Sequence, residues 1–205
     1  EILDGASLVM RVLGIPKAIV GIENNKKDAV ERMRAAASAH TGIEVRMVPT
    51  RYPQGGEKQL TYALTRRKVR TGGLPLDCGV VVSNVATAYA ISQALRKGRP
   101  IIDRAVTVGG SVREPANFVA RIGASVDSLL DAAGGLLPET KMLICGGPMM
   151  GMAISRTDIP VTKGTSGVIA LEAEVVHYEE SPCIRCGRCV QACPMRLMPA
   201  SIDRF

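Results

Sequence analysis

Four cysteines lie within eleven residues near the C-terminal end of this 205-residue sequence: Cys183, Cys186, Cys189 and Cys193. Thiolates placed this closely can hold a zinc ion, hold an iron–sulfur cluster or pair as disulfides. The intervals are C-x2-C-x2-C-x3-C, and Pro194 follows the last cysteine. Three cysteines at three-residue intervals can wrap one face of a cluster, and Gly187 lets backbone N–H groups approach the cluster sulfurs.

The intervals favour an iron–sulfur cluster over the other two kinds of site. They are those of the bacterial ferredoxin run, whose fourth cysteine ligates the other cluster in two-cluster proteins. A structural zinc site usually takes its ligands from two separated pairs, and disulfides at this density are typical of small secreted proteins. A second C-x2-C-x2-C run is absent from the sequence, so we expect the chain to stop inside its iron–sulfur domain.

The remaining cysteines, Cys78 and Cys145, stand alone in the sequence. We expect both to pack as small apolar side chains. Three cations lie among the cluster ligands or just after them: Arg185, Arg188 and Arg196. They either balance the charge of a cluster or add to a surface that attracts an acidic protein.

A second candidate site is the loop at residues 51–58, between a predicted strand and a predicted helix. Its Gly55-Gly56 pair lets a ligand approach the backbone. The N-terminus of the following helix offers free N–H groups to an anionic or carbonyl-rich ligand. Glycine pairs before helices are commonly simple turns, which is the competing interpretation.

Ser83 and Asn84 follow an apolar run and precede a predicted helix that carries Thr87. In open α/β sheets, ligands bind beyond the carboxyl ends of the strands. An asparagine can both donate to and accept from the imide and carbonyl edge of a flavin. The local pattern by itself favours a simpler role, in which Ser83 or Asn84 caps the helix.

The densest basic run is Arg66-Arg67-Lys68-Val69-Arg70. Such runs usually face water, and the functional alternative is a contact with a phosphate or an acidic protein. The net charge of +7 suits an acidic partner, a nucleic acid or an anionic membrane. Aromatic residues make up only 3% and Trp is absent, which argues against the stacking platforms of single-stranded nucleic-acid binders.

Alternating helices and strands must position these residues. Apolar periodicity predicts helices over 2–13, 28–40, 57–64 and 85–97, and strands over 18–22, 43–48 and 79–83. The connections are long enough for crossovers, so parallel strands are expected. After Arg99-Pro100 the pattern predicts strands over 101–108, 118–122, 142–145 and 168–171, and a helix over 125–133 with Ser125 as its N-cap. No run approaches the roughly 18 apolar residues of a membrane span.

Several of these motifs together resemble one family. Residues 52–60, 72–75 and 79–88 resemble the C subunit of the Rnf (Rsx) ion-translocating electron transport complex. Residues 145–151, Cys-Gly-Gly-Pro-Met-Met-Gly, and the cysteine run agree with that family in order and spacing. The resemblance covers essentially the whole chain. More distantly, the layout is similar to the flavin- and NADH-binding subunit of respiratory complex I.

The resemblance implies an α/β fold class with four parts. A Rossmann-like FMN- and NADH-binding domain with a parallel sheet would span residues 1–99, and an α+β β-grasp (SLBB) domain residues 100–155. A linker and a strand returning to the core would span residues 156–180. The first half of a ferredoxin-like domain, which holds two [4Fe–4S] clusters in the full-length protein, would span residues 181–205.

The resemblance also implies site residues. Tyr52, Gly55 and Glu57 would line the flavin and nicotinamide pocket, and Asn84 and Thr87 would contact FMN. The cluster ligands would be Cys183, Cys186, Cys189 and Cys193. A phosphate contact of residues 66–70 with the nucleotide is a looser inference. The family's glycine-rich loop and acidic flavin-contacting segment are missing from the sequence, so half of the FMN pocket is expected to be absent.

The implied function is that of a peripheral subunit on the cytoplasmic face of the membrane. It would pass electrons between NAD(H), FMN and [4Fe–4S] clusters in an ion-pumping ferredoxin:NAD oxidoreductase. Its partners would be the other subunits of that complex and ferredoxin or another acidic carrier, with no nucleic acid. A cobalamin reductase built from the same modules is one alternative. A zinc-stabilised basic binding module without redox chemistry is another.

Overall fold

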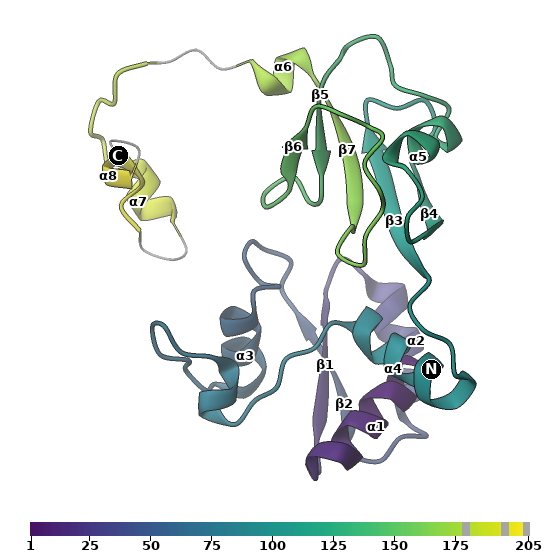
Figure 1. Ribbon diagram of the computed structural model, residues 1–205. Coiled ribbons are helices and arrows are strands. Elements are labelled where there is room, and N and C mark those ends of the chain that lie inside the picture. The colour runs from purple at the N-terminus through teal and green to yellow at the C-terminus, as the bar shows by residue number, and fades with distance from the viewer. Residues whose placement is uncertain (178–180, 194–196, 203–205) are drawn as a thin grey trace. The chain divides into compact units, whose positions relative to one another are not determined.

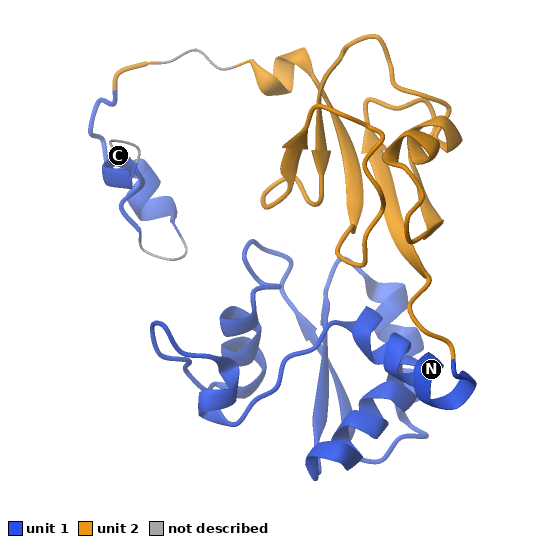
Figure 2. Ribbon diagram, viewed as in Figure 1, with its two compact units in different colours: residues 1–98, 183–205 blue, residues 99–182 orange. Residues whose placement is uncertain are grey.

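The computed structural model describes residues 1–177, 181–193 and 197–202. The chain divides into two compact units, one made of residues 1–98 with 183–205 and the other of residues 99–182 (Figure 2). Within the described ranges, no helix is both long enough and apolar enough to cross a membrane.

Residues 1–98 contain a parallel pair of strands with helices around it (Figure 1). β1 (Ala18–Glu23) pairs with β2 (Ile43–Val48), and α2 (Lys27–Ala37) connects them. α3 (Glu57–Thr65) contacts β1, and α1 (Ile2–Leu13) packs against α4 (Val85–Lys97). The sequence therefore predicts these helices and both strands correctly, except that α2 ends at residue 37 rather than 40.

The contact between α1 and α4 depends on Gly5. A Cβ atom at this position would lie 1.8 Å from the carbonyl oxygen of Ala88. Polar interactions also hold α1 against α4. Arg96 Nη2 lies 2.8 Å from Asp4 Oδ1, and the Ser92 hydroxyl donates to Asp4 Oδ2 at 2.8 Å. The hydrogen bonds from Arg96 and then Ser92 lower the pKa of Asp4 to about 2.

The strand predicted over residues 79–83 is wrong. Residues 80–84 have no regular secondary structure, and among the described residues β1 and β2 alone form the sheet of this unit. The segment follows a short 3-10 helix, η1 (Pro75–Cys78), and the side chain of Val81 is 54% exposed. A run of valines favours extended backbone, but a strand also needs a hydrogen-bonded neighbour.

Residues 99–182 contain a mixed five-stranded sheet in the order β4-β3-β7-β5-β6. Its strands are β3 (Asp103–Gly110), β4 (Ala116–Arg121), β5 (Thr140–Cys145), β6 (Met152–Ile154) and β7 (Gly167–Glu172). β7 pairs in parallel with β3 and antiparallel with β5, which makes it the central strand. β7 lies within residues 156–180, the segment predicted as a linker with a strand that returns to the core. The short helix α6 (Ala173–Val176) follows β7.

The core of this second unit lies between the sheet and α5 (Val126–Ala132). Ser125 caps α5 as predicted, since its hydroxyl accepts a hydrogen bond from the Ser128 backbone N–H at 3.2 Å. The alternation of buried and exposed residues along β3 places Val106 and Val108 in the core. Burying one face of a half-covered sheet in this way is the usual source of its stability.

Candidate functional site

The four clustered cysteines lie on an exposed loop and on the short helix α7 (Arg188–Ala192). Gly187 caps α7 with a left-handed φ of 74°, and Arg185 also has a positive φ of 56°. These residues turn the chain between successive cysteines. Another short helix, α8 (Pro199–Ile202), follows. Pro194 and Arg196 lie outside the described residues.

All four thiols are free; Cys183, Cys186 and Cys189 are exposed, and Cys193 is half-buried. The backbone N–H of Leu197 donates to Cys193 Sγ at 3.4 Å, a kind of bond that tunes cluster potentials. In the ranges that the structure describes, no three His, Cys, Asp or Glu side chains are gathered closely enough to hold a metal ion. The structure thus leaves the four thiols ungathered, and it is their type, spacing and accessibility that suit an iron–sulfur cluster. Metal binding itself would have to gather them.

Cys78 and Cys145 are half-buried rather than fully buried. The Cys78 thiol donates to the carbonyl oxygen of Pro75 at 3.1 Å, within η1. Cys145 is the last residue of β5, where it pairs with Met152 of β6. Both are therefore less buried than expected, and Cys78 also lines a cavity beside the basic run.

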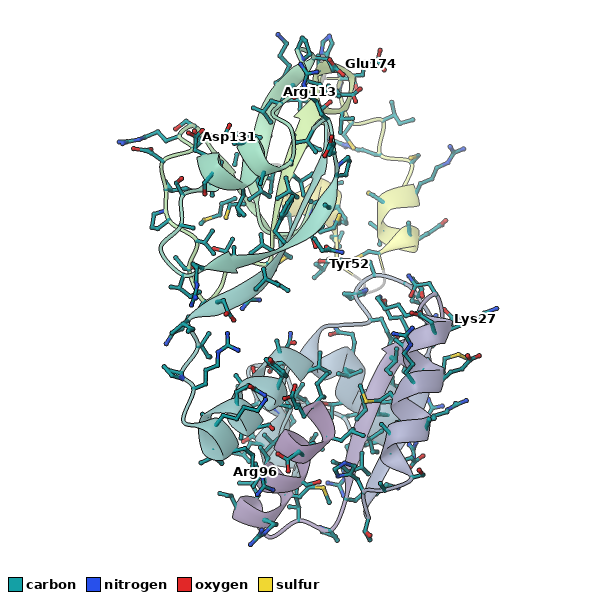
Figure 3. The ribbon with its side chains drawn as sticks, turned by 90° about the vertical axis from the view of Figure 1, so that its right-hand side faces the viewer. Lys27, Tyr52, Arg96, Arg113, Asp131 and Glu174 are labelled. Carbon is teal, nitrogen blue, oxygen red and sulfur yellow. The ribbon has the colours of Figure 1, made fainter. Side chains whose placement is uncertain are left out.

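The second candidate site lies at the carboxyl ends of β1 and β2. Asn24 and Thr50, which follow these strands, are tied together: the backbone N–H and the hydroxyl of Thr50 donate to Asn24 Oδ1 at 3.0 and 2.8 Å. The loop to α3 starts immediately after Thr50. Figure 3 shows Tyr52 and Lys27 at this end of the unit and Arg96 toward the other end. Parallel sheets bind ligands at this end.

The loop presents the predicted residues to its surroundings. Tyr52 is 57% exposed, and Gly55 and Glu57 are exposed as well. A Cβ atom on Gly55 would meet no atom within 4 Å, so the fold itself does not require glycine there. Gly56 is the N-cap of α3 and has no side chain with which to cap it. An open backbone beside a helix N-terminus fits a flat, carbonyl-rich or anionic group such as a flavin nucleotide.

Asn84 caps α4, as the local pattern favours. Its Oδ1 accepts a hydrogen bond from the Ala86 backbone N–H at 3.1 Å. Capping uses the oxygen of the carboxamide, and the exposed Nδ2 end can still donate to a ligand. Thr87 is exposed in the first turn of the same helix. Capping and a flavin contact are therefore compatible roles for Asn84.

The structure brings together two segments that the sequence keeps apart. The chain after α3 turns back, so that the Lys58 ammonium, in the first turn of α3, donates to the Arg70 carbonyl oxygen at 3.2 Å. The Arg67 guanidinium donates to the carbonyl oxygens of Cys78 and Gly79 at 2.9 and 3.1 Å. The basic run thus returns toward the start of α3.

A cavity of about 320 Å³ lies beside this fold-back, and its lining includes Lys68, Arg70 and Asp77. Two cations against one carboxylate make the cavity suitable for a phosphate group. The sequence does not indicate that the basic run and the loop are close, because the bond that joins them runs from the Lys58 side chain to a main-chain carbonyl oxygen twelve residues away. Every residue has a carbonyl oxygen, so no residue pattern predicts such a contact.

Comparison with known families identifies three consecutive domains. Residues 1–93 match the Nuo51 FMN-binding domain, residues 105–153 the SLBB domain, and residues 175–198 a 4Fe-4S binding domain. These matches support FMN and iron–sulfur clusters as cofactors. They also confirm the predicted fold class.

Three curated proteins, each the C subunit of its complex, are similar over almost the whole chain. One is the C subunit of the proton-translocating ferredoxin:NAD(+) oxidoreductase complex of Clostridium ljungdahlii. It is 47% identical over 205 residues, and the match covers 99% of this chain and 45% of that protein. That of the ion-translocating oxidoreductase complex of Rhodobacter capsulatus is 44% identical (99% of this chain, 40% of that protein). A third is the C subunit of the Na(+)-translocating ferredoxin:NAD(+) oxidoreductase complex of Acetobacterium woodii. It is 42% identical, and the match covers 100% of this chain and 47% of that protein.

Among solved structures, an NAD+-reducing [NiFe]-hydrogenase in the H2-reduced state has a similar fold, with a TM-score of 0.69 and 19% sequence identity. The match covers 84% of this chain and 36% of the hydrogenase chain. The chain spans less than half the length of the three curated relatives. Over that length, it is similar to the C subunits of ion-translocating oxidoreductase complexes.

Proposed function

We propose that this chain is part of an electron-transfer subunit that connects NAD(H), FMN and [4Fe–4S] clusters in an ion-translocating ferredoxin:NAD oxidoreductase. The observation that carries the proposal is the presence, in one chain, of an open loop at the carboxyl ends of β1 and β2 and an accessible four-thiol run. When bound, FMN supplies the exchange between two-electron hydride chemistry and one-electron transfer to clusters. That exchange is the physical reason to join the two sites.

At the nucleotide site, Tyr52, Gly55 and Glu57 would contact the flavin and nicotinamide, and Asn84 and Thr87 would contact FMN. Their exposure supports this role, because each is accessible to a ligand. The exposed phenol ring of Tyr52 offers a stacking surface. Gly55 offers close approach to the backbone.

At the cluster site, the thiolates of Cys183, Cys186 and Cys189 would hold one cluster. Cys193 would serve a second cluster, as the fourth cysteine of this run does in two-cluster ferredoxins. The exposed, turned loop supports this assignment, since it leaves the thiols free to close around the iron.

The proposed partners are the other subunits of the complex and ferredoxin or another acidic carrier. The charge distribution supports an anionic partner or ligand on the first unit. Residues 1–98 contain fifteen Lys and Arg against eight Asp and Glu, whereas residues 99–205 contain eleven of each. The entire net charge of +7 therefore falls in residues 1–98. We place the subunit at the cytoplasmic face of the membrane, held there by its partners.

The test uses the full-length subunit, purified without oxygen and reconstituted with iron, sulfide and FMN. We expect stoichiometric bound FMN and an EPR signal from reduced [4Fe–4S] clusters, with the flavin bleached by NADH. An EPR-silent protein that retains stoichiometric zinc would overturn the redox function and favour a zinc-stabilised binding module. A redox-active protein that instead reduces cobalamin and fails to restore ferredoxin:NAD activity to its complex would favour the cobalamin reductase.

A further inference from the structure

Gln54 lies between Pro53 and Gly55 in the loop before α3, and its carboxamide points away from solvent. The residue is 7% exposed, and its Nε2 has no hydrogen-bond acceptor among the described residues. Buried polar groups in folded proteins nearly always have a partner. A buried donor without one indicates an acceptor that does not belong to the chain.

The described residues contain three other buried polar atoms without a partner, on Thr61, Gln93 and Arg104. Arg104 uses its Nη1 to donate to the Lys163 carbonyl oxygen. Gln93 lies within α4. Thr61 lies within α3. Gln54 is thus the one member of this group that lies in the loop at the carboxyl end of the sheet.

The loop around Gln54 is held by its own backbone. The Gln54 N–H donates to the Arg51 carbonyl oxygen at 2.8 Å, and the Gly56 N–H donates to the Pro53 carbonyl oxygen at 2.9 Å. These turns fix the position of the side chain without using the carboxamide. The open space at Gly55 and the N-terminus of the nine-residue α3 lie within two residues of it. The buried Gln54 donor, the open space at Gly55 and the free N–H groups of α3 therefore lie within a few residues of one another.

We propose that Gln54 is a ligand-binding residue whose Nε2 donates a hydrogen bond to the ring of a bound nucleotide cofactor. The acceptor is a carbonyl oxygen or a ring nitrogen, a chemistry shared by the isoalloxazine ring of FMN and the carboxamide of NAD(H). This inference rests on the proposed function, because it supplies that site with a buried donor. Gln54 would be the buried hydrogen-bond donor of that site, whereas Tyr52, Glu57 and Asn84 are exposed.

The experiment compares Gln54→Leu and Gln54→Glu with a matched control, Thr61→Val, in the full-length subunit stripped of flavin. Thr61→Val also removes a buried polar atom without a partner, on a residue that is 2% exposed. FMN affinity is measured by fluorescence quenching, and NADH affinity is measured separately on the FMN-saturated protein. We expect Gln54→Leu to weaken binding by about 10-fold in one of the two titrations. Gln54→Glu should weaken it further, because a carboxylate cannot donate and also places a buried negative charge against the acceptor atom. Thr61→Val should leave both affinities unchanged.

The two titrations identify the acceptor: a loss for FMN assigns it to the flavin, and a loss for NADH alone assigns it to the nicotinamide. The thermal midpoint of the ligand-free protein separates binding from structure. An unpartnered carboxamide contributes nothing to the ligand-free fold, so Gln54→Leu should keep or raise that midpoint. A lowered midpoint, or wild-type affinity for both ligands, would overturn the assignment of Gln54 and leave the proposed function standing. Failure of the wild-type protein to bind FMN would overturn both.

Discussion

Lys58 and Arg70 are joined by a hydrogen bond of 3.2 Å from the lysine ammonium to the arginine carbonyl oxygen, across twelve residues of chain. The bond connects the first turn of α3 with the basic run that follows the helix. Cations that are remote along the chain thereby come near the loop that begins at Arg51.

Replacing both Lys68 and Arg70 with serine should weaken nucleotide binding by the full-length subunit several-fold at low salt. The two cations line the cavity beside the fold-back and would neutralise phosphate charge. The loss should shrink as salt is added, because exposed charges are screened within about 10 Å at 0.1 M. The control is the double change Arg32→Ser and Arg34→Ser on α2, which removes the same charge from exposed positions. Equal losses in both proteins would mean that only net charge matters.

Gly5→Ala should destabilise residues 1–98 by about 1–3 kcal/mol, the usual range for overpacking. The added methyl group would meet the Ala88 backbone at 1.8 Å, and backbone cannot rotate away as a side chain can. Urea unfolding followed by circular dichroism measures the change. An unchanged midpoint would show that α1 and α4 do not pack as closely as described.

Gly55→Ala should behave in the opposite way. Its Cβ atom would meet nothing within 4 Å, so the stability should stay within about 0.5 kcal/mol of wild type. FMN affinity should nevertheless fall, because the methyl group would occupy space that the ligand needs. Fluorescence titration and urea unfolding on the same sample distinguish these effects. Wild-type affinity would remove Gly55 from the flavin site.

Asn84 can be tested with its capping role held constant. Asn84→Ala should cost about 1 kcal/mol through the lost cap of α4, whereas Asn84→Ser keeps a capping oxygen. Both changes remove the Nδ2 donor, so both should weaken FMN binding if Asn84 contacts the flavin. Indifference of FMN affinity to both substitutions would leave Asn84 with capping alone.

The stability that Asp4 contributes should disappear in acid. Hydrogen bonds from Arg96 and then Ser92 hold its pKa at about 2, below the ordinary value of 3.8. A carboxylate with a lowered folded-state pKa stabilises fully above its unfolded pKa, and this contribution is lost as the pH falls through the folded pKa. The difference in unfolding midpoint between wild type and Asp4→Asn should therefore narrow from above pH 3.8 down to about pH 2. A constant difference would contradict the interaction with Arg96.

Serine at Cys183, Cys186 or Cys189 should abolish or alter the cluster signal after anaerobic reconstitution, because each thiolate is a proposed ligand. Cys78→Ser is the matched control, because that thiol is not a proposed ligand and instead donates a hydrogen bond to the Pro75 carbonyl oxygen. Iron content and EPR measure the outcome. A cluster that survives all three substitutions would contradict the assigned ligands.

Local signals in the sequence account for most of the fold. The helix of residues 2–13 ends at Gly14, whose left-handed φ of 64° is the conformation that glycine adopts readily. Ser125 and Asn84 cap the helices that they precede. Each of these features depends on neighbours a few residues away. The pattern of side chains is therefore enough to predict them.

Features that depend on distant partners could not be predicted. The valines at 80–82 have strand propensity without a pairing partner, so no strand forms there. The return of Arg70 to Lys58 uses a carbonyl oxygen, which every residue possesses. At the candidate site, the sequence indicated the exposed members of the loop but not Gln54, because burial and an unmet hydrogen bond are properties of the folded chain.

The position of β7 determines when the second unit can be completed as the chain is synthesised. β3 with β4, and β5 with β6, are hairpin pairs that can form as soon as each has been translated. Their inner edges stay unpaired until residues 167–172 are made and fill the gap between β3 and β5. On the ribosome, the unit therefore spends the translation of residues 155–172 as two separate hairpins with open edges. That interval is when a chaperone would have most to protect.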